Sequence, residues 1–87
     1  MNWTVIWRPL AEGTLAILWM NAPDRNALAR AADEIDSLLA RDPLGQGESR
    51  KGNVRVMFVP PLGALYEVSE LDRLVTVLKI WEIPPPR

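Results

Sequence analysis

The order of apolar and polar residues divides the first part of the chain into a short strand and a helix. Residues 3–7 are rich in β-branched and aromatic side chains, which favours a strand. Residues 9–20 then fit a helix, because Pro9 suits the first helical turn, where an amide hydrogen is not needed. The stretch 21–24 interrupts the apolar pattern, and Pro23 within it is expected at the first position of a second helix.

The second helix has the clearest periodicity in the chain. Apolar residues recur at spacings of three and four between residues 28 and 39, and residues 42–43 (Asp-Pro) end the helix. A glycine-rich loop follows at residues 44–53. Segments rich in β-branched residues then predict strands joined by short turns, at residues 54–59, 64–68 and 74–81.

The predicted order β-α-α-β-β-β defines an α+β fold of two layers. The N-terminal strand lies beside a strand of a three-stranded antiparallel meander, and the two helices form an antiparallel hairpin on the sheet. Residues 1–82 are assigned to this single domain. Residues 83–87 form a proline-rich C-terminal tail, for which a polyproline II conformation is expected.

Two helices cover only one face of such a sheet, so the other face meets solvent or a partner. Alternation along the strands predicts the side chains on this open face: Arg8, Arg55, Met57, Glu67, Lys79 and Trp81. A face that mixes apolar side chains with a few charges is typical of a protein-docking surface. The alternative is a solvated face whose charges keep the strands from pairing with other chains.

The composition narrows the chemistry. With 87 residues, 48% of them hydrophobic and 24% charged, the chain has the composition of one folded domain. It has no cysteine and no histidine, which excludes disulfides, thiolate zinc sites and the commonest general base. A net charge of −1 argues against a protein that coats nucleic acid. The acidic residues Asp33, Glu34 and Asp36 are interpreted as a solvated helix face, and no metal or cofactor is expected.

Targeting signals are not evident in the sequence. No apolar run is long enough to span a bilayer, and the N-terminus lacks the pattern of a secretion signal. The lack of cysteine is compatible with a reducing compartment. A cytoplasmic location is therefore expected.

Basic and aromatic residues in the second half of the chain are the candidates for contact with a macromolecule. Arg50 and Lys51 end the glycine-rich loop, and Arg55 follows in the next strand, so a phosphate-binding cluster is one interpretation. A solvated loop end, or pairing with an acidic partner, is the other. Trp81 is expected to be partly exposed, stacked on a base or inserted into a pocket of a partner. The other tryptophans are assigned to the core: Trp3, Trp7 and Trp19.

A set of short motifs in a fixed order carries a family resemblance. They are Trp7-Arg8-Pro9, Ala11-Glu12 with Leu15, Pro23, Asp42-Pro43, Gly47 with Arg50, Leu65-Tyr66-Glu67-Val68 and Val75-Thr76-Val77-Leu78. In this order and spacing, residues 3–82 resemble the RelE/ParE toxin superfamily. Each motif is weak by itself, and together they are specific to the superfamily but not to one branch of it.

The resemblance implies the toxin of a type II toxin–antitoxin module that blocks growth. Such toxins are small cytoplasmic proteins, each held inactive in a hetero-oligomer by an antitoxin that wraps its C-terminal segment around the toxin. RelE-like members cleave mRNA in the ribosome without metal, through basic residues and in many cases a C-terminal tyrosine. ParE-like members poison DNA gyrase and need no catalytic residues. A catalytically inactive protein-interaction module on the same scaffold is the alternative to both.

By this resemblance Arg55 is the candidate catalytic residue, because a guanidinium in a fixed position stabilises the charge of a phosphorane. The candidates for contact with RNA or another target are Arg50, Lys51, Arg55, Lys79 and Trp81. The candidates for contact with the antitoxin are Arg8, Met57, Glu67 and Trp81. Glu67 would act as a base only if it lay beside Arg55, and Tyr66 is assigned to the core.

Several positions depart from the ribonuclease branch. Met57 stands where a second basic residue is common, and Gly63 stands near the position of an arginine in active RelE-like enzymes. Residues 81–83 and the prolines after them replace the usual basic and tyrosine positions. These departures fit the gyrase-directed branch or an inactive member, and they leave the two toxic activities unranked.

Overall fold

One mixed sheet and two helices make up residues 2–84, the part of the chain that the computed structural model describes. The helices are α1 (Pro9–Asn21) and α2 (Arg25–Arg41). The strands are β1 (Thr4–Trp7), β2 (Glu48–Ser49), β3 (Val54–Val59), β4 (Leu62–Ser69) and β5 (Leu74–Glu82). They lie in the order β1-β5-β4-β3-β2, with β1 parallel to β5 and the other neighbouring pairs antiparallel.

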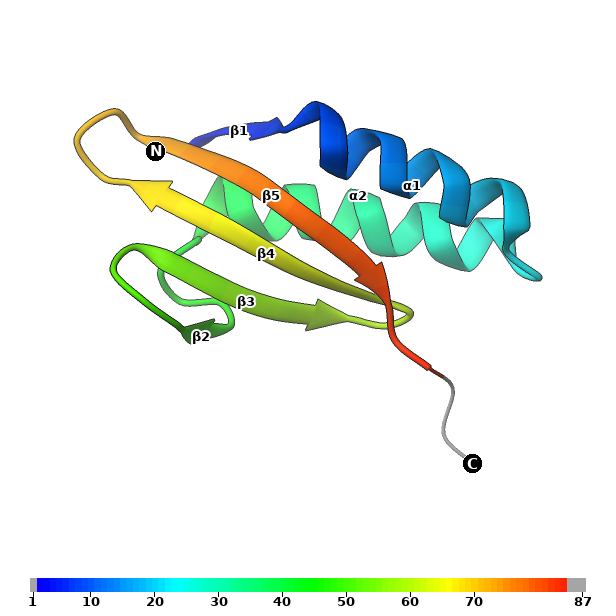
Figure 1. Cartoon of the computed structure of the whole chain (residues 1–87). Helices are drawn as coiled ribbons and strands as arrows, with labels where there is room; N and C mark the ends of the chain where they lie inside the picture. The colour runs from blue at the N-terminus through cyan, green and yellow to red at the C-terminus, as the bar shows by residue number, and fades with distance from the viewer. Residues whose placement is uncertain (1, 85–87) are drawn as a thin grey trace.

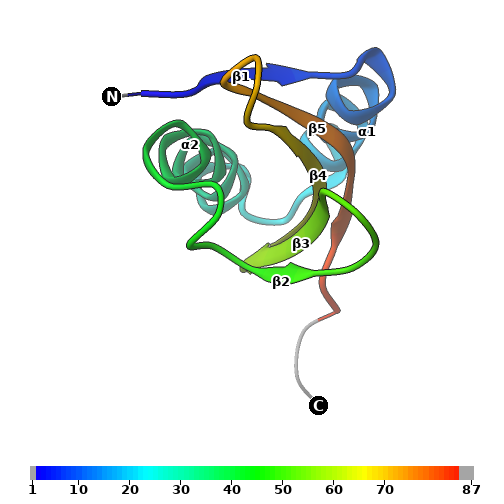
Figure 2. The ribbon, with the colours of Figure 1, turned by 90° about the vertical axis from the view of Figure 1, so that its left-hand side faces the viewer.

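The arrangement confirms the predicted α+β fold of two layers. Figure 1 shows α1 and α2 side by side and running in opposite directions, with β4 and β5 crossing in front of α2. Seen from the end, the sheet curves and α2 lies on its concave side (Figure 2). The strand β2 was absent from the prediction, because a two-residue strand has no alternating pattern to reveal it within the loop 44–53.

The start of α2 is fixed by a cap residue. The carboxylate of Asp24 accepts a hydrogen bond from the amide of Ala27 at 3.0 Å, and the helix begins one residue after Asp24. Pro23 therefore precedes the cap, and its predicted place at the first helical position is wrong. The helix ends before Asp42, as predicted.

The core lies between the two helices and one face of the sheet. The apolar stripe of α2 contributes Leu28, Ile35 and Leu39, all of which are fully buried. Fully burying one such side chain contributes about 1.5–3 kcal/mol, so this stripe accounts for much of the attachment of α2 to the sheet. The strands supply the opposite wall of the core, including Ala64, Tyr66, Val68, Val75 and Val77.

The two faces of β3 are the reverse of the prediction. Met57 is 3% exposed and belongs to the core, whereas Phe58 is 55% exposed on the open face. Alternation requires only that neighbouring side chains point to opposite faces, and it does not say which set points inward. The pairing with β4 shows the choice, because Met57 lies opposite Ala64 of the core wall and Phe58 lies opposite Gly63. The predicted place of Met57 on the open face is therefore wrong.

A bulge in β5 changes the alternation partway along the strand. The register between β4 and β5 shifts so that Leu78 is an extra residue in β5. Val77 is buried before the bulge and Ile80 is buried after it, although their numbers differ by three. Lys79 and Trp81 consequently lie on the open face, as predicted, but Val77 does not share that face with them.

The last described residues follow β5 out of the sheet. The amide of Ile83 donates to the carbonyl of Pro61 at 2.8 Å, which attaches this segment to the turn between β3 and β4. The predicted polyproline II conformation falls mainly on residues 85–87, which lie outside the described residues. Among residues 2–84, neither helix combines the length and the apolar character needed to cross a bilayer.

Candidate functional site

An aromatic pair occupies one end of the open face. Phe58 of β3, Gly63 of β4 and Trp81 of β5 are successive partners across the three strands. The rings of Phe58 and Trp81 meet edge to face, with centroids 6.2 Å apart and planes at 78°. The indole covers Gly63 so closely that a Cβ atom there would overlap Trp81 Cε2. Trp81 is partly exposed, as predicted, and a glycine beneath it makes this packing possible.

The middle of the open face mixes charge with apolar surface. Lys79 is exposed and pairs with Leu65 of β4. Glu67 lies on the same face opposite Thr76, and Ile6 of β1 continues that row of side chains. A cation and a carboxylate thus lie among apolar side chains, which suits contact with a protein better than contact with a polyanion.

Met57 lies outside this surface, and Arg8 lies at the end of β1, the edge strand of the sheet. Arg8 is exposed at the junction of β1 and α1, where its amide donates to the carbonyl of Val77 at 3.0 Å. Its own carbonyl accepts from the amide of Glu12, so Arg8 caps the start of α1. Met57 lies in the core and is covered by the helices, so it offers no surface to a partner of the folded chain.

Arg55 faces the helix side of the sheet and holds a loop. It pairs with Tyr66 across β3 and β4, which places both side chains on the same face. Arg55 Nε donates to the carbonyl of Gln46 at 3.1 Å, and Nη2 donates to the carbonyl of Gly47 at 3.4 Å. Its predicted place on the open face is wrong, for the same reason as that of Met57. Glu67 points to the opposite face and therefore does not lie beside Arg55.

The hydroxyl of Tyr66 holds the same loop from the core. Its oxygen lies 2.8 Å from the carbonyl oxygens of both Pro43 and Gln46. The hydroxyl has one proton to donate to these two carbonyl oxygens. The carbonyl of Gln46 also accepts a hydrogen bond from Arg55 Nε, so the carbonyl of Pro43 relies more strongly on Tyr66 as its donor. Burial raises the pKa of the Tyr66 hydroxyl above its ordinary value of 10.0, while the adjacent Arg55 guanidinium acts in the opposite direction. The hydroxyl therefore remains a donor at neutral pH.

Substituting Arg55 by alanine is expected to lower the free energy of unfolding by about 1–2 kcal/mol, because two charged hydrogen bonds to loop carbonyls are lost. Urea denaturation of the purified variant measures this loss. Arg41→Ala is the control, since Arg41 is exposed and its side chain donates to the carbonyl of Ser37 within its own helix. Equal midpoints for the two variants would contradict a clamp at Arg55.

Arg50 and Lys51 occupy the exposed turn between β2 and β3. Arg50 forms an ion pair with Glu48 at 3.5 Å, and exposed pairs of this kind add little stability. Lys79 lies on the open face, whereas Arg55 points to the helix side. The structure therefore does not bring Arg50, Lys51, Arg55 and Lys79 together on one face as a phosphate cluster.

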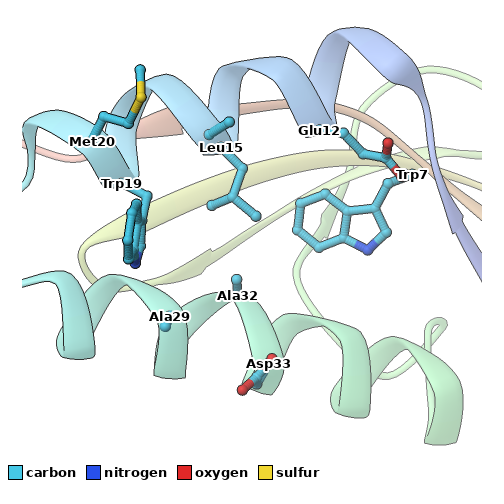
Figure 3. A pocket seen from close by; sticks show the side chains of 9 residues that line it. Trp7, Glu12, Leu15, Trp19, Met20, Ala29, Ala32 and Asp33 are labelled. Carbon is cyan, nitrogen blue, oxygen red and sulfur yellow. The ribbon is translucent and has the colours of Figure 1, made fainter.

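An apolar groove runs between α1 and α2. It has a volume of about 670 Å³. Figure 3 shows Trp7, Leu15 and Trp19 projecting into the space between the helices, opposite Ala29 and Ala32 of α2. Glu12 and Asp33 also line it. The groove joins residues of β1, α1 and α2 in one surface.

Sequence reasoning missed this groove. It assigned Trp19 to the core, but Trp19 is 43% exposed. The available signal was that α1 is apolar on almost every side, with Leu10, Ile17 and Met20 outside the stripe that the core needs. A helix with apolar residues on every side is normally buried, either within its own chain or against another molecule. The rest of this chain leaves part of α1 exposed.

Arg25 packs on Trp19, one of the residues that line the groove. Its guanidinium lies 4.6 Å from the ring centroid of Trp19, and it donates to the carbonyls of Trp19 and Met20 at 3.1 Å each. It therefore caps the negative end of α1.

Arg25→Ala is expected to lower the free energy of unfolding by about 1 kcal/mol. Thermal unfolding measures this, with Arg30→Ala on the outer side of α2 as the control, and equal melting temperatures would contradict the capping role.

Sequence comparison gives no relative for this chain. No protein-family model matches it, and no curated protein matches it significantly in sequence. Any likeness to known proteins must therefore be read from the structure.

Solved structures resemble it along nearly its whole length. A chain of the RelBE2 toxin–antitoxin complex from Mycobacterium tuberculosis superposes with a TM-score of 0.74 at 19% identity, covering 94% of this chain and 92% of that one. A chain of the chromosomal ParDE system of P. aeruginosa gives 0.70 at 16% identity, covering 94% and 97%. A chain of the RelE–RelB complex from Pyrococcus horikoshii gives 0.70 at 16% identity, covering 99% and 100%. The chain therefore has the fold of the RelE/ParE toxins, as the order of its sequence motifs predicts.

Proposed function

We propose that this chain is the toxin of a type II toxin–antitoxin module, acts in the cytoplasm and is neutralised by an antitoxin encoded beside it. The observation that carries the proposal is the likeness of fold, which spans nearly the whole of this chain and of chains from toxin–antitoxin complexes of both RelE and ParE type. The chain adds no further domain to that fold within the described residues.

The exposed apolar surface supports a stable protein partner. Large apolar side chains are exposed on the open face, as Ile6 and Phe58, and on α1, as Leu10, Ile17 and Met20. A monomer that works alone rarely leaves several such patches in water. An antitoxin that covers them while the module is silent accounts for this surface.

We favour poisoning of a protein target such as DNA gyrase over cleavage of mRNA. Cleavage requires fixed positive groups around one phosphate, to neutralise the charge that develops there. Arg55 is instead engaged by the carbonyls of Gln46 and Gly47, and Lys79 lies on the opposite face of the sheet. Phe58 and Trp81 beside Lys79 form an aromatic and cationic patch of the kind that anchors protein interfaces.

Induced expression separates the two modes of action. Pulse labelling after induction is expected to show a fall in DNA synthesis and an SOS response, with protein synthesis continuing at first. The variant Lys79→Glu/Trp81→Ala is expected to lose this effect, whereas Arg30→Glu, on the outer side of α2, is expected to keep it. A rapid arrest of translation that a folded Arg55→Lys variant loses would instead support mRNA cleavage. Normal growth with the folded protein present would support the inactive interaction module.

A further inference from the structure

One side of α1 carries a row of uncharged side chains that points away from the groove. The row, here called the outer stripe, follows helical spacings of four, three and four and consists of Leu10, Thr14, Ile17 and Asn21. Ile17 is two positions from both Leu15 and Trp19 of the groove, and residues two apart on a helix point to nearly opposite sides. Leu10 and Ile17 are 64% and 57% exposed, and Figure 1 shows α1 at the border of the molecule.

The two polar side chains of the outer stripe bond within the helix. Thr14 Oγ1 donates to the carbonyl of Leu10 at 2.9 Å, and Asn21 Nδ2 donates to the carbonyl of Ile17 at 2.9 Å. Such bonds to the preceding turn leave less of each polar group for water. Glu12, the one ionisable residue of α1, lines the groove instead. The outer stripe is therefore an uncharged surface of a kind that a helix facing only water does not carry.

The spacing of the outer stripe suits pairing of α1 with an antiparallel copy of itself. Alternating steps of three and four residues form the seam between two packed helices. About a two-fold axis, Leu10 lies opposite Asn21 of the second copy, and Ile17 lies opposite Thr14 of the second copy. This register uses all four positions of the stripe. Because none of them is charged, self-pairing brings no like charges together in the seam.

The charges at the ends of α1 favour the same arrangement. Arg8 directly precedes the helix, and its side chain makes no capping hydrogen bond. A cation there meets the positive end of the helix dipole, which is unfavourable within one chain. The last turn of α1 holds no basic residue of its own, and Arg25 of α2 covers this end on the side of Trp19 and the groove. In an antiparallel pair each Arg8 lies near the negative end of the other α1, whereas a parallel pair would bring the two Arg8 side chains together.

We infer that the outer stripe of α1 joins two copies of the free chain in an antiparallel dimer with two-fold symmetry. Arg8 of each copy lies beside the end of the other α1, and the groove takes no part in the contact. A standard interface uses about 20–30 residues per partner, and this contact uses fewer, so its dissociation constant is expected to be about 10–100 μM.

Sedimentation velocity of the purified full chain across this concentration range tests the dimer. The unmodified chain is expected to change from monomer to dimer as its concentration rises, with no larger species, because a two-fold contact is closed. Ile17→Glu is expected to weaken the association at least about tenfold, since it places two carboxylates in the seam. Ala16→Glu is the matched control, because it adds the same charge at an exposed position of α1 on the groove side, and it is expected to keep the dimer. A monomer at every concentration, or a greater loss with Ala16→Glu than with Ile17→Glu, would overturn the inference.

Arg8→Asp separates the dimer contact from the stability of a single chain. Aspartate is a preferred residue at this position of a helix, so the melting temperature of the dilute monomer is expected to rise. The dimer is expected to weaken about threefold or more, because each new carboxylate lies beside the negative end of the other helix. Arg30→Asp, on the outer side of α2, makes the same change of charge and is expected to keep the dimer. A dimer that Arg8→Asp leaves at full strength would overturn the antiparallel arrangement.

Introduced thiols report which residues meet, because the chain has no cysteine of its own. Leu10→Cys and Asn21→Cys chains are mixed and oxidised in air, with one of them lengthened by a tag. The mixed disulfide is expected to form faster than either variant links to itself, because only opposed thiols come within bonding distance. Faster linkage of each variant to itself would show a parallel pair and overturn the inference.

The dimer of the free chain does not depend on the proposed function. A neutralising antitoxin that covers Leu10 and Ile17 would replace the second copy, and this replacement alone rests on that function. If the chain stays monomeric but its expression stops growth, the dimer inference is wrong and the toxin proposal stands. If the chain dimerises as expected but growth is normal, the dimer stands and the toxin proposal is wrong.

Discussion

Substituting Tyr66 by phenylalanine is expected to lower the free energy of unfolding by about 1–3 kcal/mol, although a single oxygen atom is removed. The hydroxyl lies 2.8 Å from the carbonyls of Pro43 and Gln46, in a fully buried position. After substitution Gln46 still receives Arg55 Nε, but Pro43 loses the bond that the structure shows for its carbonyl. Urea denaturation at neutral pH measures the loss.

Combining the Tyr66 substitution with one at Arg55 tests whether the two side chains hold the loop together. Because Tyr66 and Arg55 share Gln46 as an acceptor, each single variant leaves that carbonyl one donor, whereas the double variant Tyr66→Phe/Arg55→Ala removes both. The double variant is therefore expected to lose more than the sum of the two single variants. Additive losses would mean that the two side chains act independently and would contradict a shared clamp on the loop.

The same hydroxyl predicts a pH dependence in the alkaline range. Burial raises the pKa of Tyr66 in the folded chain above 10.0, so the unfolded chain loses this proton first as the pH rises. The unfolded state then binds fewer protons, and stability falls above pH 10 by up to about 1.4 kcal/mol per pH unit until the folded pKa is reached. Tyr66→Phe is expected to lack this component, so its stability curve converges with that of the unmodified chain at high pH. Parallel curves would show that the tyrosine does not titrate differently on folding.

Substituting Gly63 by alanine is expected to lower the free energy of unfolding by about 1–3 kcal/mol, because the new methyl group overlaps the indole of Trp81. The ideal Cβ position overlaps Trp81 Cε2, and the same ring meets Phe58 edge to face. In a Trp81→Ala background the same substitution is expected to cost much less. Thermal unfolding of the four chains of this cycle measures the coupling.

Gly13 provides the matched control for this prediction. A Cβ atom at Gly13 meets no atom within 4 Å, and the residue lies inside α1. Gly13→Ala is therefore expected to raise stability by about 0.5–1 kcal/mol, since alanine favours the helix. A stabilising effect at Gly63 as well, or an equal loss with and without Trp81, would contradict the packing described for the open face.

The elements of the fold were predictable where one face of an element is buried. The stripe from Leu28 to Leu39 follows helical spacing because α2 has one apolar side against the sheet, and it appears in the sequence as plainly as in the structure. The strands were predictable in extent but not always in orientation. Phe58 and Met57 are both apolar, so sequence alone did not show that the smaller Ala64 would accept Met57 and leave Phe58 outside.

The candidate site was less predictable than the fold. The position of Arg55 depended on the orientation of β3, so the error at Met57 carried over to it. The bulge at Leu78 shifts the alternation of β5, so that Lys79 and Trp81 point to the open face although Val77 points to the core. No local sequence pattern indicates the position of this bulge. The groove required knowing that α1 covers β5 with only part of its apolar surface, which depends on three-dimensional packing.

The most direct measurement is survival of bacteria that express this chain from an inducible promoter, alone and together with the product of its neighbouring gene. We expect colony counts to fall steeply when the chain is expressed alone and to recover when both proteins are made, with the two proteins purifying as one complex. Undiminished counts in cells that contain the soluble, folded chain would contradict its assignment as a toxin.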